Sequence, residues 1–349
     1  MKRTLLILGA GASKDVFDFF PTGYELIKDI AFHLTVDCQR PVMDGEGPCV
    51  SSLMNELIRS FTLDQAFIGQ AIPYEHFERR QTQSFLAEVL KAKTALWKYV
   101  MHFEHKRPRN RLAPKEAISI DEFVDKQFCD EPLIKEIVQY SISYLLCGCE
   151  GALKDRLDEA NPEVVHANWI AALAGKLKVY SSDEIEANLK VVTLNYERSF
   201  EYLFDQYRTG SGRSAIPSGC VEHFYGTLGS MAELPFGSAN DETRTVLATD
   251  GRFKLMFPYR EQKDWSTEQP FDQVLVLGFG FDSTNIDRLR LQELTPATIA
   301  ATGRGVNMSR REELMNAERI LFPKVKYNLD GRECERDMTC TEVIEAHEF

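Results

Sequence analysis

Five runs of apolar residues predict the strands of a buried sheet. They occupy residues 3–8, 177–181, 189–194, 220–226 and 272–278. Little alternation with polar residues is typical of parallel strands that are covered on both faces. Helical spacing of apolar side chains predicts helices at residues 24–34, 197–207 and 284–291. This order of elements predicts an α/β fold, a Rossmann-like doubly wound parallel sheet.

A long helical stretch separates the first strand from the others. Apolar residues recur at intervals of three and four over most of residues 51–173, most clearly in residues 85–100. Residues 37–48, rich in Gly, Pro and Asp, are expected to form a loop. We therefore expect a Rossmann-like domain from residues 1–36 and 176–349, with residues 37–175 as a large helical insertion, which a surface loop tolerates.

Composition and charge narrow the class of protein. The chain has 349 residues, of which 44% are apolar, and no apolar run is long enough to span a bilayer. Because the first apolar run follows only two basic residues and leads into a glycine turn, it is a poor signal peptide. We expect a cytoplasmic protein without membrane contact.

The net charge of −12 argues against direct nucleic-acid binding. The short basic stretch at residues 106–115 is expected to be a solvated loop, with a nucleic-acid or partner contact as the alternative.

Cysteine and histidine spacing argues against a metal site. No two of the eight cysteines are spaced as CxxC, which excludes a zinc ribbon built from two such pairs. Cys147 and Cys149 lie in an apolar segment and are expected to be reduced core residues. The seven histidines form no HExxH motif. We expect no metal.

Small and polar residues follow several predicted strands. In a parallel sheet such residues meet at one edge, where anionic ligands bind. They are Gly9, Ala10, Gly11, Ala12 and Ser13 after the first strand, Asn195 after the run at 189–194, His223, Tyr225 and Gly226 around the end of the run at 220–226, and Gly278, Gly280, Asp282 and Asn285 after the last. Lys14 replaces the third glycine of the dehydrogenase fingerprint, and no strand-end acid follows about twenty residues later. The sequence predicts a nucleotide site, but not that of a dehydrogenase.

Two of these residues are candidates for catalysis. Asn195 either caps the following helix or holds a ribose hydroxyl or a water. His223 is either a structural histidine or a general base, since imidazole titrates near neutral pH. Asp282 and Asn285 also fit the start of a helix. The segment SIDE fits a capping box, with Ser119 as N-cap and Glu122 at the third helical position.

These motifs together resemble the SIR2-like family, specifically its bacterial members from anti-phage defence. The resemblance rests on LILGAGAS with Pro21-Thr22-Gly23, SIDEF at 119–123, VVTLNYE at 191–197, EHFYGTLG at 222–229 and VLGFGFDSTN at 276–285. It implies that Gly9 to Ser13 cradle NAD, that Asp121, Tyr225, Gly226, Gly278, Gly280, Asp282 and Asn285 also bind it, and that Asn195 and a histidine act at the nicotinamide ribose. Two positions depart from the family pattern. Tyr225 stands where a histidine usually precedes the glycine, and Glu197 stands in place of the usual aspartate.

The resemblance implies hydrolysis of NAD, as substrate, to nicotinamide and ADP-ribose in anti-phage defence. Our hypothesis is that backbone amides at Gly9 to Ser13 hold the pyrophosphate, residues 278–285 shape the adenosine side, Asn195 holds the ribose and His223 takes a proton. The alternative is a non-catalytic module that senses NAD or ADP-ribose within a defence complex. An NAD-dependent protein deacylase is a weaker alternative, because the zinc module is absent from the sequence. We expect a homo-oligomer or a partner defence protein such as an ATPase, with the helical insertion and the residues after Phe322 as contact surfaces.

Overall fold

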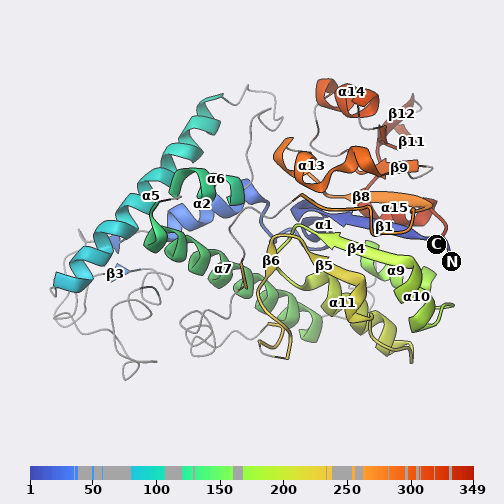
Figure 1. The fold of residues 1–349 in the computed structure, drawn as a ribbon, viewed down its shortest axis with the longest axis horizontal. Coiled ribbons are helices and arrows are strands. Elements are labelled where there is room, and N and C mark those ends of the chain that lie inside the picture. Colours follow the sequence, from blue (N-terminus) through green and yellow to red (C-terminus); the bar gives the residue numbers. More distant parts are fainter. Residues whose placement is uncertain are drawn as a thin grey trace.

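Six parallel strands form the central sheet (Figure 1). The computed structural model describes residues 1–34, 36–37, 49–50, 57, 80–106, 120–128, 130–159, 168–232, 234–237, 254–255, 262–281, 283–294, 298–303, 306, 308–317, 319–329 and 332–349. The spatial order of the strands is β10-β9-β8-β1-β4-β5, and every neighbouring pair is parallel. The strands are β1 (Thr4–Leu8), β4 (Leu189–Thr193), β5 (Val221–His223), β8 (Gln273–Leu277), β9 (Thr298–Ala301) and β10 (Ile320–Leu321). Numbered along the chain this order is 6-5-4-1-2-3, the order of the Rossmann fold. The predicted α/β class and parallel sheet are confirmed.

Strand β1 shows why the central strands are mainly apolar. All five of its residues are buried. Leu5 and Ile7 pack into one hydrophobic core, and Leu6 and Leu8 pack into a second core on the opposite face. Successive side chains of a strand point to opposite faces, so a strand covered on both sides needs an uninterrupted apolar run.

Helices cover both faces of the sheet. In Figure 1, α13 (Ser283–Leu289) lies on one side, and α9 (Trp169–Leu177), α10 (Ser182–Asn188) and α11 (Ser199–Gly210) lie on the other. Helix α9 also contacts α15 (Cys340–Ala346). Helices α1 (Ala10–Val16) and α14 (Met308–Ala317) complete this layer structure around the sheet.

Four further helices pack together beside the sheet (Figure 1). They are α2 (Gly23–His33), α5 (Arg80–Lys106), α6 (Ile120–Phe128) and α7 (Pro132–Glu159), and α2 contacts the other three. Helix α2 begins at a capping box in which Thr22 accepts from the amide of Glu25 and the Glu25 carboxylate accepts from the amide of Thr22. This explains the Pro-Thr-Gly element as a helix start. The division of the chain into domains at residues 36 and 176 stays a prediction.

Two predicted strands differ from the structure. Residues 177–181 are not a strand, because Leu177 ends α9 and Ser181 is the N-cap of α10, where it forms a capping box with Glu184. The run at 220–226 is divided between β5 and β6 (Gly226–Thr227), and β6 pairs with β7 (Lys254–Leu255) outside the main sheet. The chain turns between them at residues 224–225, and Gly226 has a positive φ of 94°.

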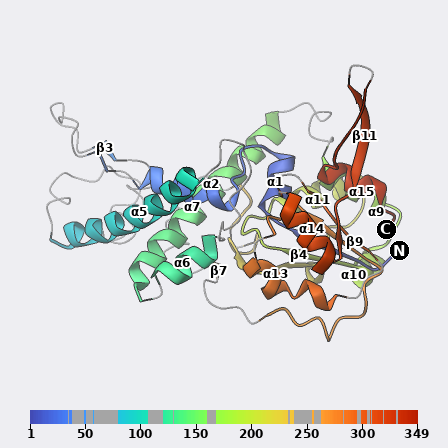
Figure 2. The ribbon, with the colours of Figure 1, turned by 90° about the horizontal axis from the view of Figure 1, so that it is seen from above.

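Several strands were not predicted. Besides β7, β9 and β10 these are β2 (Val36–Asp37), β3 (Cys49–Val50) and the hairpin of β11 (Lys324–Leu329) and β12 (Arg332–Asp337). Figure 2 shows this hairpin projecting away from the sheet. In the ranges that the structure describes, no helix combines the length and the apolar character needed to cross a bilayer.

Three glycines bring the turns after β1 and β8 into backbone contact. The amide of Gly9 donates to Leu277 O and the amide of Gly11 donates to Gly278 O, both at 2.9 Å. A Cβ atom on Gly9 or Gly11 would lie 2.6 or 2.8 Å from Gly278 O. Gly278 itself has a φ of +59°, in the left-handed region that favours glycine. The glycines of the GAGAS segment therefore have a packing role.

Replacing Gly278 with alanine should destabilise the protein. The new Cβ would lie 1.8 Å from the amide nitrogen of Ala12, and the backbone would keep an unfavourable φ. We expect the free energy of unfolding to fall by about 2–4 kcal/mol, measured by urea denaturation. Gly280→Ala is the matched control, because no described atom lies within 4 Å of the place that its new Cβ would take. Equal stability of the two variants would contradict the packing role.

Candidate functional site

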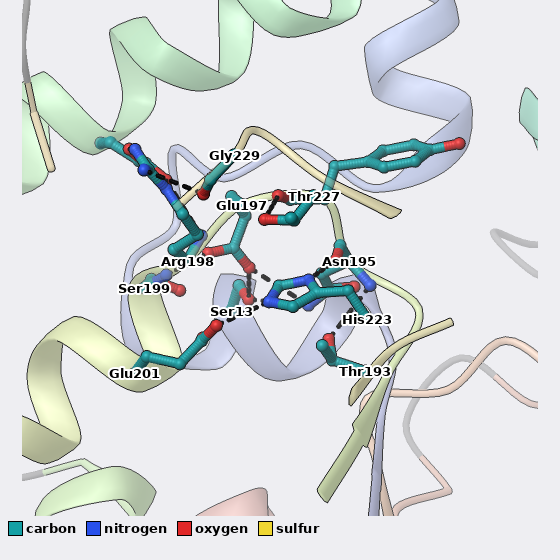
Figure 3. Close-up of polar contacts among 12 residues, drawn as sticks. Ser13, Thr193, Asn195, Glu197, Arg198, Ser199, Glu201, His223, Thr227 and Gly229 are labelled. Carbon is teal, nitrogen blue, oxygen red and sulfur yellow. Dashed lines mark hydrogen bonds and ion pairs between the residues drawn. The ribbon is translucent and has the colours of Figure 1, made fainter. Parts of the chain in front are cut away.

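A cluster of polar side chains lies at the carboxyl ends of β1, β4 and β5, beside the point where the strand order reverses. This polar cluster consists of Ser13, Asn195, Glu197, Glu201 and His223. From β1 the chain continues to β4 on one side, and β8 lies on the other. Ligands of doubly wound folds bind in the crevice at this position. Ser13 comes from α1, Asn195 and Glu197 follow β4, and His223 ends β5. Figure 3 shows these side chains and Glu201 pointing toward one another.

Asn195 is fixed by its side-chain amide group. Nδ2 donates to Ser13 Oγ at 2.9 Å, to Glu197 Oε1 at 3.2 Å and to Gly9 O at 3.3 Å. Since a backbone carbonyl and a carboxylate can only accept, these contacts settle which end of the amide is nitrogen. The residue is half-buried, and no donor in the described part of the chain binds Oδ1. The Nδ2 contacts therefore hold the side chain of Asn195, with Oδ1 bound by no described donor.

Glu197 is a buried carboxylate held by neutral donors. Ser13 Oγ donates to Oε1, and the amide of Ser199 donates to Oε2 at 2.6 Å. Burial raises the pKa of Glu197 above its usual range, although the hydrogen bonds from Ser13 and Ser199 act to lower it. No Lys, Arg or His side chain among the described residues forms a salt bridge with Glu197. The carboxylate is thus a stronger proton acceptor than an exposed glutamate.

His223 is engaged at both ring nitrogens. Nδ1 lies 2.8 Å from Asn195 O, so it carries the proton and donates to that carbonyl. Nε2 lies 2.6 Å from Glu201 Oε1 on α11. Burial of the ring acts to lower the pKa of His223, but the Glu201 carboxylate and the Asn195 carbonyl outweigh it and raise that pKa. The arrangement favours an imidazolium that holds the backbone of Asn195.

A second polar contact lies around Tyr225. Its hydroxyl donates to Asn285 Oδ1 of α13, and Arg288 Nη1 donates to the same hydroxyl at 3.5 Å. The Arg288 guanidinium also lies 5.7 Å from the centre of the Tyr225 ring. Tyr225 and Asn285 are both buried. The structure therefore brings together two of the residues that the sequence assigned to ligand binding.

Other predicted site residues have different surroundings. The amides of Gly9, Gly11 and Ala12 each donate to a backbone carbonyl. Gly280 is exposed and follows β8, and Gly226 begins β6. Ala10 is the first residue of α1.

Two of the assigned acids are described only in part or not at all. Asp121 lies in α6, but its side chain is not among those that the structure describes. Asp282 lies outside the described residues, as do Ser119 and most of the basic stretch at 106–115.

Sequence reasoning missed Glu201 and the buried pair of Arg198 with Glu150. Glu150 of α7 accepts from Arg198 at Nε, Nη2 and the backbone amide, and Arg198 Nη1 donates to Leu234 O at 2.6 Å. The side chains of the pair are only 2% and 1% exposed. Three charged residues within the short segment at 197–201 were the available signal, because charges so close to a buried strand need partners.

Comparisons with known proteins find no relative. No family model matches the chain, and no curated protein or solved structure matches it either. In the described part of the chain, no three His, Cys, Asp or Glu side chains are grouped to hold a metal ion.

The ion pair of His223 should make stability depend on pH. A histidine whose pKa is raised on folding stabilises the protein below its unfolded pKa, and this contribution is lost as the pH rises through the folded pKa. His223→Gln should therefore cost more unfolding free energy at about pH 6 than at about pH 9, measured by urea denaturation. Glu201→Gln should show the same trend, while Glu197 and Glu150 remain in both variants. A cost that does not change with pH would contradict the ion pair.

Removing Glu150 should destabilise the protein strongly. Glu150→Ala leaves the buried Arg198 guanidinium without its carboxylate, which costs about 3 kcal/mol or more. Glu88→Ala is the control, because it breaks a pair with Lys91 on the surface of α5 and should barely move the urea midpoint. Similar midpoints for the two variants would contradict this expectation.

Proposed function

We propose that this chain cleaves NAD to nicotinamide and ADP-ribose. The observation that carries the proposal is the fixed amide of Asn195, held by Ser13, Gly9 and Glu197 at the edge of a sheet with Rossmann strand order. Nucleotides bind at this place in doubly wound folds. The motif resemblance to the SIR2-like family supports NAD as the particular nucleotide and bacterial anti-phage defence as the context.

The chemistry demands positioning more than a strong nucleophile. Nicotinamide leaves as a neutral pyridine from a cationic ring, and positive charge develops on the ribose. Asn195 Oδ1 would accept from a ribose hydroxyl or from the attacking water, while the three contacts of Nδ2 prevent the amide from turning. An acceptor that is fixed before the substrate arrives needs no reorganisation in the transition state.

Such a reaction requires control, because it consumes a central metabolite. We propose that a second copy of the chain or a partner defence protein, such as an ATPase, regulates it. The contact of α7 with the site through Glu150 and Arg198 supports the helices beside the sheet as the surface for this regulation. The residues after Phe322, which include the projecting hairpin, are the other candidate surface.

A non-catalytic NAD- or ADP-ribose-binding module is the second candidate. Two observations favour it. Tyr225 stands where the family pattern has a histidine, and its hydroxyl is already bonded to Asn285. Both nitrogens of His223 are engaged as well.

Asn195→Ala should strongly slow nicotinamide release from NAD. The variant loses the fixed acceptor of the cluster, and we expect the rate to fall by about 100-fold or more, measured by chromatography of nicotinamide from the purified full chain. Asn188→Ala removes an amide that binds Glu184 O at the end of α10 and should leave the rate unchanged.

The outcomes separate the two candidate functions. Unchanged turnover in Asn195→Ala would contradict the role of Asn195. Binding of NAD by the wild-type chain in calorimetry, without nicotinamide release alone or in phage-infected cells, would favour the sensing module.

A further inference from the structure

We propose that Ser13 and Glu197 form a proton relay that deprotonates the water attacking the ribose. This inference rests on the proposed hydrolysis of NAD and assigns its proton acceptor. The water donates to Ser13 Oγ, and Ser13 passes its own proton to Glu197 Oε1. Glu197, rather than His223, is then the final base.

The ring of His223 is not free to act as the general base. A general base needs a nitrogen lone pair that faces the substrate. In this structure Nδ1 carries a proton toward Asn195 O, and Nε2 faces the Glu201 carboxylate. An imidazole that accepted a proton from water would first have to give up its contact with Glu201. His223 is therefore placed to position Asn195.

Tyr225 occupies the position where the family pattern has a histidine. A neutral phenol is a poor proton acceptor, because the lone pairs of its oxygen are weakly basic. Its hydroxyl donates to Asn285 Oδ1 and is approached by Arg288. These contacts leave the proton acceptor of the reaction unassigned at both positions of the EHFYG motif.

The hydroxyl of Ser13 connects Asn195 with Glu197. Its hydroxyl accepts from Asn195 Nδ2 at 2.9 Å and donates to Glu197 Oε1. A hydroxyl has two lone pairs, so Ser13 Oγ can accept one further hydrogen bond. The neighbouring Asn195 is half-buried, and it is the residue proposed to hold the ribose or the water. The hydroxyl thus bridges Asn195 and the buried carboxylate.

The environment of Glu197 makes its carboxylate more basic. Its side chain is buried and its hydrogen-bond partners are neutral donors. Burial raises the pKa of this carboxyl, which makes its ionised form a better proton acceptor than an exposed glutamate. Glu150 and Glu201, the neighbouring acids, are instead paired with Arg198 and His223.

The proposed step exchanges one bond at the ribose and transfers two protons in a chain. The bond between ribose C1′ and the nicotinamide nitrogen breaks, and its electron pair neutralises the pyridinium ring. A bond forms between C1′ and the water oxygen. One water proton moves to Ser13 Oγ as the Ser13 proton moves to Glu197 Oε1. The products are nicotinamide, ADP-ribose and a protonated Glu197, which later returns its proton to solvent.

The test compares water with a nucleophile that has no proton to lose. Azide attacks C1′ as an anion and gives ADP-ribosyl azide, which chromatography separates from ADP-ribose. In the full chain, Glu197→Gln should lower hydrolysis by about 100-fold or more and leave azidolysis within a few-fold of wild type. Ser13→Ala should lower hydrolysis more than azidolysis, and azidolysis should also fall, because Asn195 Nδ2 loses its contact with Ser13 Oγ. Glu197→Asp, which keeps the carboxylate, should restore part of the hydrolysis.

Two further variants complete the design. His223→Gln should lower both reactions equally, because it disturbs the position of Asn195. Glu186→Gln changes an exposed carboxylate on α10 and should change neither reaction. In Glu197→Gln, the side-chain NH2 group can face the Ser199 amide N–H, and two donors cannot form a hydrogen bond. Thermal melting therefore checks that each variant folds.

The outcomes distinguish this inference from the function on which it rests. Equal loss of both reactions in Glu197→Gln, or no loss of hydrolysis, would overturn the relay while NAD cleavage stands. A selective loss of hydrolysis in His223→Gln would identify His223 as the base and also overturn it. A wild-type chain that cleaves NAD with neither nucleophile would overturn the proposed function, and the relay with it.

Discussion

The backbone contact between the turns after β1 and β8 is the constraint on which the site depends. Gly11 N donates to Gly278 O, and neither Gly9 nor Gly11 has room for a side chain against that carbonyl. This close approach places α1 across the point where the strand order reverses. It thereby sets Ser13 against Asn195 and Glu197, which arrive from β4. The glycine segment therefore allows the backbones of the two turns to pack closely. This packing brings the side chains of the polar cluster together.

Three carboxylates at this edge differ in how their charge is satisfied. Glu150 is paired with Arg198, and Glu201 is paired with His223. Glu197 is bonded to Ser13, Asn195 and the Ser199 amide. An ion pair stabilises the ionised carboxylate, whereas burial with neutral donors leaves the pKa of Glu197 raised. One fold therefore gives neighbouring glutamates different protonation behaviour through their environment alone.

The same charges connect the site with the helices beside the sheet. Arg198 follows Glu197 directly, and its guanidinium also binds the carbonyls of Gly229 and Leu234. Glu150, its partner, belongs to α7, which packs with α2, α5 and α6. Because a buried pair tolerates little displacement, the position of α7 and the geometry around Glu197 are linked. The fold thus joins its catalytic candidates to the surface proposed for regulation.

The sequence by itself determined the strands at residues 3–8, 189–194 and 272–278, because a strand buried on both faces must be mainly apolar. It also placed Asn195 and His223 at one edge. Only the tertiary structure decided that residues 177–181 end one helix and cap the next, since a short apolar run fits either state. It likewise decided the partners of Glu197 and His223. Ser13 and Glu197 lie 184 positions apart, and no local pattern encodes a hydrogen bond over that separation.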